Sequence, residues 1–279
     1  PMLGKVIREF LPAEDLLSYL EAILRVYNQL GRRDNKYKAR IKIMVHELGA
    51  EVVRDLVEDE WLATRDSALK LPQDEITRIR NNFLPPVFED VVIPDPDHQV
   101  QEPGFIAWQH TNVHAHKQPG YNIVTVSLKA FGIAPGDASA EQMYVLANLA
   151  DAYSFGEIRV SHEQNLILPH VRADQLPALW QSLQRVGLGT ANAGLATDII
   201  SCPGMDFCTL ASARSIPVAL AITERLDDLE RLHNIGELKI KISGCVNACA
   251  HHHIGHIGIL GLEKKGEEFY QVTVGGRAD

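Results

Sequence analysis

The residues best suited to chemistry are four cysteines, all in the last third of the chain. Cys202 and Cys208 are separated by five residues, and Cys245 and Cys249 by three. Four thiolates from two loops can bind one tetrahedral metal ion or one cubane cluster. Zinc, disulfides of an exported protein and unrelated buried thiols remain alternatives. Because all four cysteines fall within residues 202–249 and the five-residue gap is wide for a zinc knuckle, the pattern favours a [4Fe–4S] cluster.

Histidines come soon after the last cysteine, at positions 251, 252, 253 and 256. Taken alone, adjacent histidines near a cysteine would suggest metal ligands. Neighbouring side chains on a helix or strand point in different directions, so they cannot all reach one ion. We interpret these histidines as groups that line or support a site.

The elements that position these residues are read from hydrophobic spacing. Apolar residues three and four apart predict helices in the first part of the chain, at 13–30, 38–48 and 51–61. Proline-rich turns at 84–86 and 93–97 predict a linker within 71–103. The first part is therefore expected to be helical and separate from the rest of the chain.

The remaining chain mixes strands and helices. Strand patterns at 121–128, 157–160 and 165–168 alternate with helical patterns at 140–153, where Ser139 is a candidate cap, and at 174–186. This β–α–β–β–α order is typical of a ferredoxin-like unit. Further patterns predict a helix at 210–226 and strands at 238–243, 257–262 and 269–274.

Composition narrows the function classes. The 279 residues, 46% of them hydrophobic, suggest about two domains with real cores. The net charge of −9 argues against a nucleic-acid partner. No apolar run approaches the ~18 residues of a membrane span, and the first residues lack a signal peptide, so a cytoplasmic protein is expected. One basic run, 32–42, has six cations and one acid; we interpret it as a solvated helix face, with a patch for an anionic cofactor or acidic partner as the alternative.

The cysteine segments Ser201–Cys208 and Ile242–Cys249, with the adjoining Ala250–Gly261, strongly resemble the sirohaem-dependent nitrite/sulfite reductase family, most closely bacterial assimilatory sulfite reductase haemoproteins. Segments Gly31–Lys42 and Phe155–Leu166 agree, so the resemblance covers essentially the whole chain. It implies an α+β fold: a ferredoxin-like nitrite/sulfite reductase half-domain followed by an α/β sirohaem/[4Fe–4S] domain, both part of a larger pseudo-two-fold protein.

The resemblance also implies domain limits. Residues 1–85 would be the mostly helical end of the preceding half plus a linker, 86–175 the ferredoxin-like half-domain, and 176–279 the cluster- and sirohaem-binding domain. The chain would then be truncated at both ends. The family's anion-binding arginines and lysines would lie upstream of residue 1, so we expect this fragment alone to be inactive.

Site residues carry over one by one. The four cysteines would bind one [4Fe–4S] cluster, and Cys249 would also bridge to the sirohaem iron as its axial ligand. Sirohaem has eight carboxylates, so its pocket needs cations and hydrogen-bond donors. The residues expected to contact the cofactors are Asn247, Arg159, Gln164, Asn165 and Arg214.

The function implied is the six-electron reduction of sulfite to sulfide. Reduction of nitrite to ammonia on the same cofactors is the alternative within the family. From other classes, an iron–sulfur electron carrier or a zinc-stabilised interaction module remains possible. The electron donor would be a ferredoxin or an NADPH-dependent flavoprotein, with no membrane or nucleic-acid partner.

Overall fold

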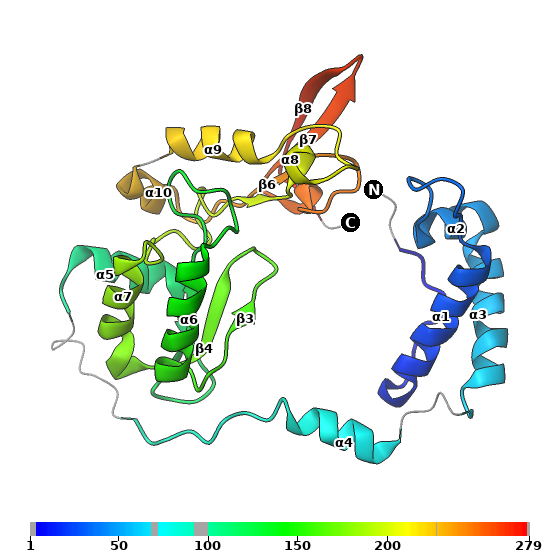
Figure 1. Cartoon of the computed structure of the whole chain (residues 1–279), viewed down its shortest axis with the longest axis horizontal. Coiled ribbons are helices and arrows are strands. Elements are labelled where there is room, and N and C mark those ends of the chain that lie inside the picture. Colours follow the sequence, from blue (N-terminus) through cyan, green and yellow to red (C-terminus); the bar gives the residue numbers. More distant parts are fainter. Residues whose placement is uncertain (1–3, 68–71, 92–99, 227, 278–279) are drawn as a thin grey trace. The chain divides into compact units, whose positions relative to one another are not determined.

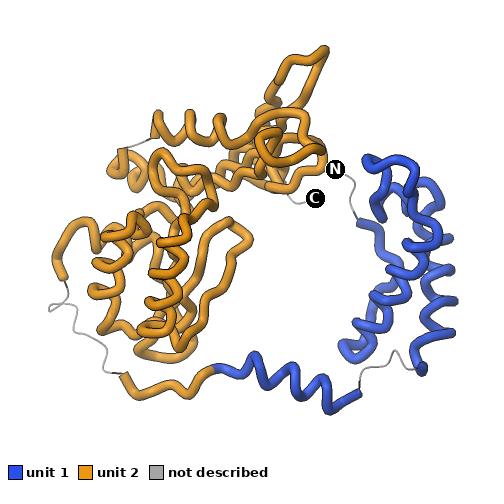
Figure 2. The backbone as a smooth tube through the Cα atoms, in the orientation of Figure 1, with its two compact units in different colours: residues 1–85 blue, residues 86–279 orange. Residues whose placement is uncertain are grey.

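The chain forms two compact units, which Figure 2 shows in different colours. The units are residues 1–85 and 86–279. The computed structural model describes residues 4–67, 72–91, 100–226 and 228–277. The predicted turn at 93–97 lies outside these residues.

Unit 1 is helical, as predicted. A short 3₁₀ turn leads into α1, and α2 and α3 come next; their bounds are Ala13–Asp15, Leu16–Leu30, Ile41–Leu48 and Ala50–Thr64. Tyr19 and Trp61 pack edge to face with ring centroids 5.5 Å apart, inside a core whose residues recur at helical spacing. A further helix, α4 (Gln73–Asn81), occupies part of the predicted linker, where prolines only flank the helical stretch.

The first part of unit 2 has the predicted ferredoxin-like order. An antiparallel sheet with strand order β1-β2-β4-β3 carries helices α5, α6 and α7 (Figure 1). Ser139 caps α6, and Gln142 returns the bond to its backbone N–H. The bounds are α5 Pro103–Asn112, β1 Val113–Ala115, β2 Tyr121–Val126, α6 Ala140–Tyr153, β3 Arg159–Val160, β4 Leu166–Arg172 and α7 Leu176–Arg185.

Helix α7 belongs to this half-domain. Its buried residues Leu179, Trp180 and Leu183 share one apolar core with Trp108 and with sheet residues such as Leu168. The boundary expected after residue 175 therefore falls inside a core. The core ends near residue 191, and a second core begins at residue 195.

The second core is built on a sheet of order β5-β6-β7-β8. Strands β5, β6 and β7 are parallel, and β8 forms an antiparallel hairpin with β7 that projects from the sheet (Figure 1). The bounds are β5 Ile200–Ser201, α8 Gly204–Phe207, α9 Ile216–Arg225, α10 Leu229–Ile235, β6 Ile240–Ser243, β7 Ile257–Lys264 and β8 Glu267–Val274.

The helix predicted over 210–226 begins only at Ile216. The residues before it are held in a loop, because the backbone N–H groups of Ser212 and Ala213 both donate to the carbonyl of Gly244. Those donors are then unavailable for helical bonds, and Pro217 fits the first turn of the shortened helix. No helix among the described residues is long and apolar enough to cross a membrane.

A buried polar network joins the two cores of unit 2. The Lys129 Nζ lies 2.5 Å from Asp198 Oδ1, with side chains 1% and 4% exposed. The same ammonium donates to the Glu163 carbonyl at 2.6 Å and to Asn165 Oδ1 at 3.2 Å. A second amide, that of Asn192, donates to the carbonyl of Lys129. Charges this deep persist only when they are paired and hydrogen-bonded.

Replacing Lys129 by Ala should therefore destabilise unit 2 by about 3–5 kcal/mol, because the Asp198 carboxylate loses its buried counter-charge. Hydrogen exchange at the amides of β2 and β4, measured against urea concentration, gives the change. The control is Arg159→Ala: the ion pair of Arg159 with Glu157 is exposed and should contribute about 0–1 kcal/mol. Equal losses in the two variants would contradict the assignment.

Candidate functional site

The two cysteine pairs begin at the ends of neighbouring parallel strands. Strand β5 ends at Ser201, just before Cys202, and β6 ends at Ser243, two residues before Cys245. In the register of these strands Ser201 lies opposite Ile242. The carboxyl ends of parallel strands meet at one edge of a sheet, so both cysteine loops emerge together.

Backbone hydrogen bonds tie the two loops to each other. The N–H of Cys202 donates to the Ile242 carbonyl at 3.0 Å, and the N–H of Gly244 donates to the Cys202 sulfur at 3.0 Å. The Gly244 carbonyl in turn accepts from Ser212 and Ala213 at 2.9 and 3.0 Å. A backbone N–H aimed at a sulfur stabilises the thiolate form that binds metal.

Glycines allow this contact. A Cβ on Gly244 would lie 2.6 Å from the Ala213 carbonyl and 3.0 Å from the Gly204 Cα. A Cβ on Gly261 would lie 2.6 Å from the Ala213 Cβ and 3.2 Å from the Gly244 Cα. The first loop, the second loop and strand β7 therefore touch through small residues only.

The four thiols differ in exposure. Cys245 is buried, Cys202 and Cys208 are half-buried, and Cys249 is exposed; the structure holds all four as thiols, not disulfides. No three His, Cys, Asp or Glu side chains in the described part of the chain lie close enough to bind a metal ion. The donor set and the shared edge fit a four-thiolate cluster, and ligation requires the side chains to converge.

Two of the other predicted site residues contact strand β5 or the residues just before it. The Gln164 amide bonds both backbone groups of Ser201, accepting from its N–H at 2.9 Å and donating to its carbonyl at 2.8 Å. Asn165 is 1% exposed, and its amide donates to Asp198 Oδ1 at 3.0 Å. Their side chains are thus engaged with protein groups, and direct contact with a cofactor stays a prediction.

The remaining predicted residues are on the surface or at its edge. Arg159 is exposed, with Glu157 2.6 Å away. Arg214 is exposed between Asp206, at 3.6 Å, and Glu268, at 3.9 Å. Asn247 is half-buried in the turn between Cys245 and Cys249. The structure does not gather these three around one point, and their cofactor contacts also stay predictions.

Sequence reasoning missed two groups that shape the site. Ser215 donates its hydroxyl to the Cys202 carbonyl, and its oxygen lies 3.6 Å from the Cys202 sulfur. The second group is the buried Lys129–Asp198 pair, whose Asp198 lies two residues before β5. The only signal for it was a lysine directly after the Ile-, Val- and Thr-rich strand, and that signal names no partner.

Of the histidines after Cys249, His252 is buried and His253 half-buried, whereas His251 and His256 are exposed. Burial, and then the neighbouring His253, lower the pKa of His252; burial, and then His251, lower that of His253. The rings of His251 and His253 stack with centroids 6.0 Å apart. Burial also lowers the pKa of Lys241 on β6, whereas the hydrogen bond to Glu163 raises that of Lys239.

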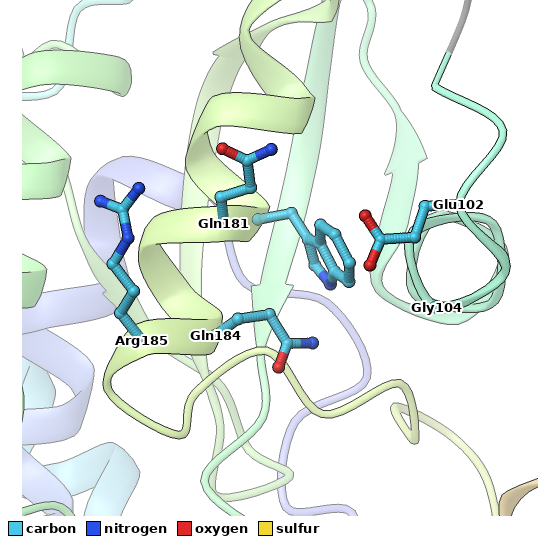
Figure 3. A pocket seen from close by; sticks show the side chains of 6 residues that line it. Glu102, Gly104, Gln181, Gln184 and Arg185 are labelled. Atoms are coloured by element: carbon cyan, nitrogen blue, oxygen red, sulfur yellow. The ribbon is translucent and has the colours of Figure 1, made fainter.

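Two cavities lie elsewhere in unit 2. One of about 500 Å³ is bordered by α5 and α7, and Figure 3 shows Gln181, Gln184 and Arg185 on α7 with Glu102 across from them. Another of about 220 Å³ lies beside Tyr121, Phe155 and His170. Neither is lined by a cysteine, so they are separate from the candidate site.

Gly244→Ala should push the two cysteine loops apart, because the new methyl group meets backbone atoms that cannot rotate away. We expect a loss of about 1–3 kcal/mol in the stability of unit 2. Exchange of the Ser212 and Ala213 amides, whose acceptor is Gly244, should accelerate most. Gly4→Ala is the control, since a Cβ there meets nothing within 4 Å. Unchanged exchange at both amides would show that the contact is not tight.

Comparison with known proteins agrees with this arrangement. The family profile described as "Nitrite and sulphite reductase 4Fe-4S domain" matches residues 1–64 and 195–279. The profile described as "Nitrite/Sulfite reductase ferredoxin-like half domain" matches residues 114–186. The second match ends just after α7, consistent with the core that contains this helix.

Relatives of both kinds are similar to the chain. The chloroplastic ferredoxin–nitrite reductase of Arabidopsis thaliana is 29% identical over 96% of this chain and 41% of the relative. The ferredoxin–nitrite reductase of Synechococcus elongatus is 28% identical over 97% of this chain and 47% of the relative. Sulfite reductase [ferredoxin] 2 of Mycolicibacterium paratuberculosis is 25% identical over 99% and 45%. The chain thus spans less than half of each relative.

Among solved structures, that of the Mycobacterium tuberculosis NirA protein has the same fold, with a TM-score of 0.65 at 23% identity over 99% of this chain and 46% of that one. The two family profiles, the ferredoxin-like half-domain and the paired cysteine loops lead to one conclusion: the chain belongs to the nitrite and sulphite reductase family, whose members bind sirohaem and a [4Fe–4S] cluster.

Proposed function

We propose that this chain carries the cofactor-binding part of an enzyme that reduces sulfite to sulfide with six electrons. The observation that supports it is the meeting of both cysteine loops at the ends of β5 and β6, held by the Gly244 N–H on the Cys202 sulfur. Family membership supplies the reaction class, an oxidoreductase acting on sulfite or nitrite.

The residues proposed to hold the cluster are Cys202, Cys208, Cys245 and Cys249, with Cys249 also reaching the sirohaem iron. When bound, the two groups supply successive one-electron transfers to an anion at the haem iron. The exposed position of Cys249 at the rim of the loop suits a thiolate shared with a large planar group. The Gly244 N–H, which donates to the Cys202 sulfur, stabilises negative charge on that sulfur.

Arg159, Arg214 and Asn247 are proposed to meet the sirohaem carboxylates. Arg159 and Arg214 are exposed, and each is now paired with acidic neighbours, so each can turn toward an arriving carboxylate. Asn247, inside the second cysteine loop, would donate to the macrocycle. A side-chain amide and two guanidinium groups suit a ligand with many carboxylates.

Reduction of nitrite to ammonia is the second candidate. It is favoured by the relatives named ferredoxin–nitrite reductase, which are 26–29% identical, against 23–25% for those named sulfite reductase. Both kinds of relative are named for ferredoxin, so we propose a ferredoxin as electron donor; an NADPH-dependent flavoprotein is the alternative. A cytoplasmic location is part of the proposal, since a reducing compartment keeps such thiols available.

The chain produced with a supply of sirohaem and iron should show the absorption bands of sirohaem on an iron–sulfur background. An iron–sulfur shoulder alone would favour an electron carrier, and a colourless protein that retains zinc would favour an interaction module.

In the longest protein that carries this chain, kcat/KM for sulfite should exceed that for nitrite by about tenfold or more, equivalent to about 1.4 kcal/mol of transition-state stabilisation. A preference for nitrite would establish the second candidate.

Cys249→Ser should lose sirohaem as well as the cluster, because one sulfur is proposed to serve both. Pigment and iron contents after purification measure the two losses separately. Thr209→Ser, an exposed change in the first cysteine loop, serves as the matched control and should retain both groups. Full sirohaem occupancy in the serine variant would rule out the bridging role.

A further inference from the structure

The turn between β3 and β4, residues 161–165, contacts the cysteine-bearing part of unit 2 at three places. The Glu163 carboxylate lies 3.1 Å from the Lys239 ammonium, just before β6. Gln164 bonds Ser201 of β5, and Asn165 bonds Asp198 just before β5. Three consecutive residues therefore form hydrogen bonds or an ion pair at β5, or just before β5 and β6, the strands that lead into the cysteine loops.

Gln164 occupies the middle of this turn in a conformation that needs support. Its φ of +58° lies in the left-handed region, which is unfavourable for a residue with a side chain. The Ser161 hydroxyl accepts from the N–H groups of Glu163 and Asn165 and so holds the turn. Gly136 packs against Gln164, since a Cβ there would lie 3.2 Å from the Gln164 Cβ. The backbone thus aims this one amide at β5.

The amide is well matched to its target. Ser201 is 3% exposed, and both of its backbone groups bond to Gln164, at 2.9 and 2.8 Å. Strand β5 has only two residues, so it contributes few ladder bonds of its own. The next residue is Cys202, whose N–H reaches β6 and whose carbonyl accepts from Ser215. Gln164 therefore determines much of the position of the Cys202 backbone.

We propose that Gln164 is a positioning residue that fixes Cys202 through the backbone of Ser201, rather than a group that contacts the macrocycle. The two-point bond sets the end of β5 against β6, so that the Cys202 sulfur faces the Gly244 N–H. Hydrogen bonds from a buried amide fix both the distance and the direction of the contact, whereas apolar packing does not fix direction. The inference rests on the proposed function only in taking Cys202 as a cluster ligand.

The test compares three variants of the full chain without metal. Gln164→Leu keeps the size of the side chain and removes both hydrogen bonds. Gln164→Glu keeps the acceptor for the Ser201 N–H and loses the donor to its carbonyl. Gln181→Leu is the matched control, because Gln181 is an exposed glutamine on α7 and borders the cavity of Figure 3. Far-UV circular dichroism verifies that each variant is folded.

We call the two hydrogen bonds between Gln164 and the Ser201 backbone the Gln164 clamp, and the following measurements test it. Hydrogen exchange at the Ser201 amide should accelerate by about tenfold in Gln164→Leu, the effect of losing a buried hydrogen bond, and stay near the parent rate in Gln164→Glu. The alkylation rate of Cys202, relative to that of Cys208, should change with Gln164→Leu and not with Gln181→Leu. Iron bound after reconstitution should fall in the same variant.

Unchanged exchange at Ser201 in Gln164→Leu would overturn the proposal, as would faster exchange that leaves both Cys202 alkylation and iron binding unaltered. If Gln164→Leu does not fold, retention of the Ser201 protection in Gln164→Glu supports the clamp and its loss refutes it. A chain in which Gln164 controls Ser201 and Cys202, and in which no variant binds iron, would uphold the clamp and reject the cluster.

Discussion

The structure of the site depends on the close backbone contact between the two cysteine loops. Gly244 lies against Ala213 and Gly204, and its carbonyl and N–H bond to one loop at three points: Ser212, Ala213 and the Cys202 sulfur. Even a methyl group at position 244 would not fit between these segments without moving them. Main-chain atoms therefore fix the spacing of the two loops, and the Cys202 sulfur takes part in that contact.

The parts of the fold that arise from local pattern were predictable. Helical spacing in unit 1 and the capping box at Ser139 and Gln142 report on neighbours within a few residues, and α6 has the predicted limits. The cysteine spacing likewise indicated one site formed by two loops. Patterns of this kind depend on residues that are close in the sequence, so they can be recognised without the tertiary structure.

Features that depend on distant partners were not predictable. Residues 210–215 read as helix because their apolar spacing is helical, yet the N–H groups of Ser212 and Ala213 donate to the carbonyl of Gly244, some thirty residues on. Helix α7 shares a core with the sheet that precedes it, and spacing could not show this, because it tells which face is apolar and not which core receives it. Lys129 is a lone charge in the sequence, and only the fold brings Asp198 to it.

These polar contacts explain how unit 2 holds its cysteine loops in register. The first apolar core ends at Ala191 and the second begins at Leu195. Apolar packing alone would therefore leave the relative position of the two cores loosely defined. The bonds of Lys129, Gln164 and Asn165 cross that junction with fixed directions and short distances. Because hydrogen bonds weaken steeply with misalignment, they limit sliding of β5 far more than a hydrophobic surface of equal area would. The half-domain thus acts as the frame against which the first cysteine is placed.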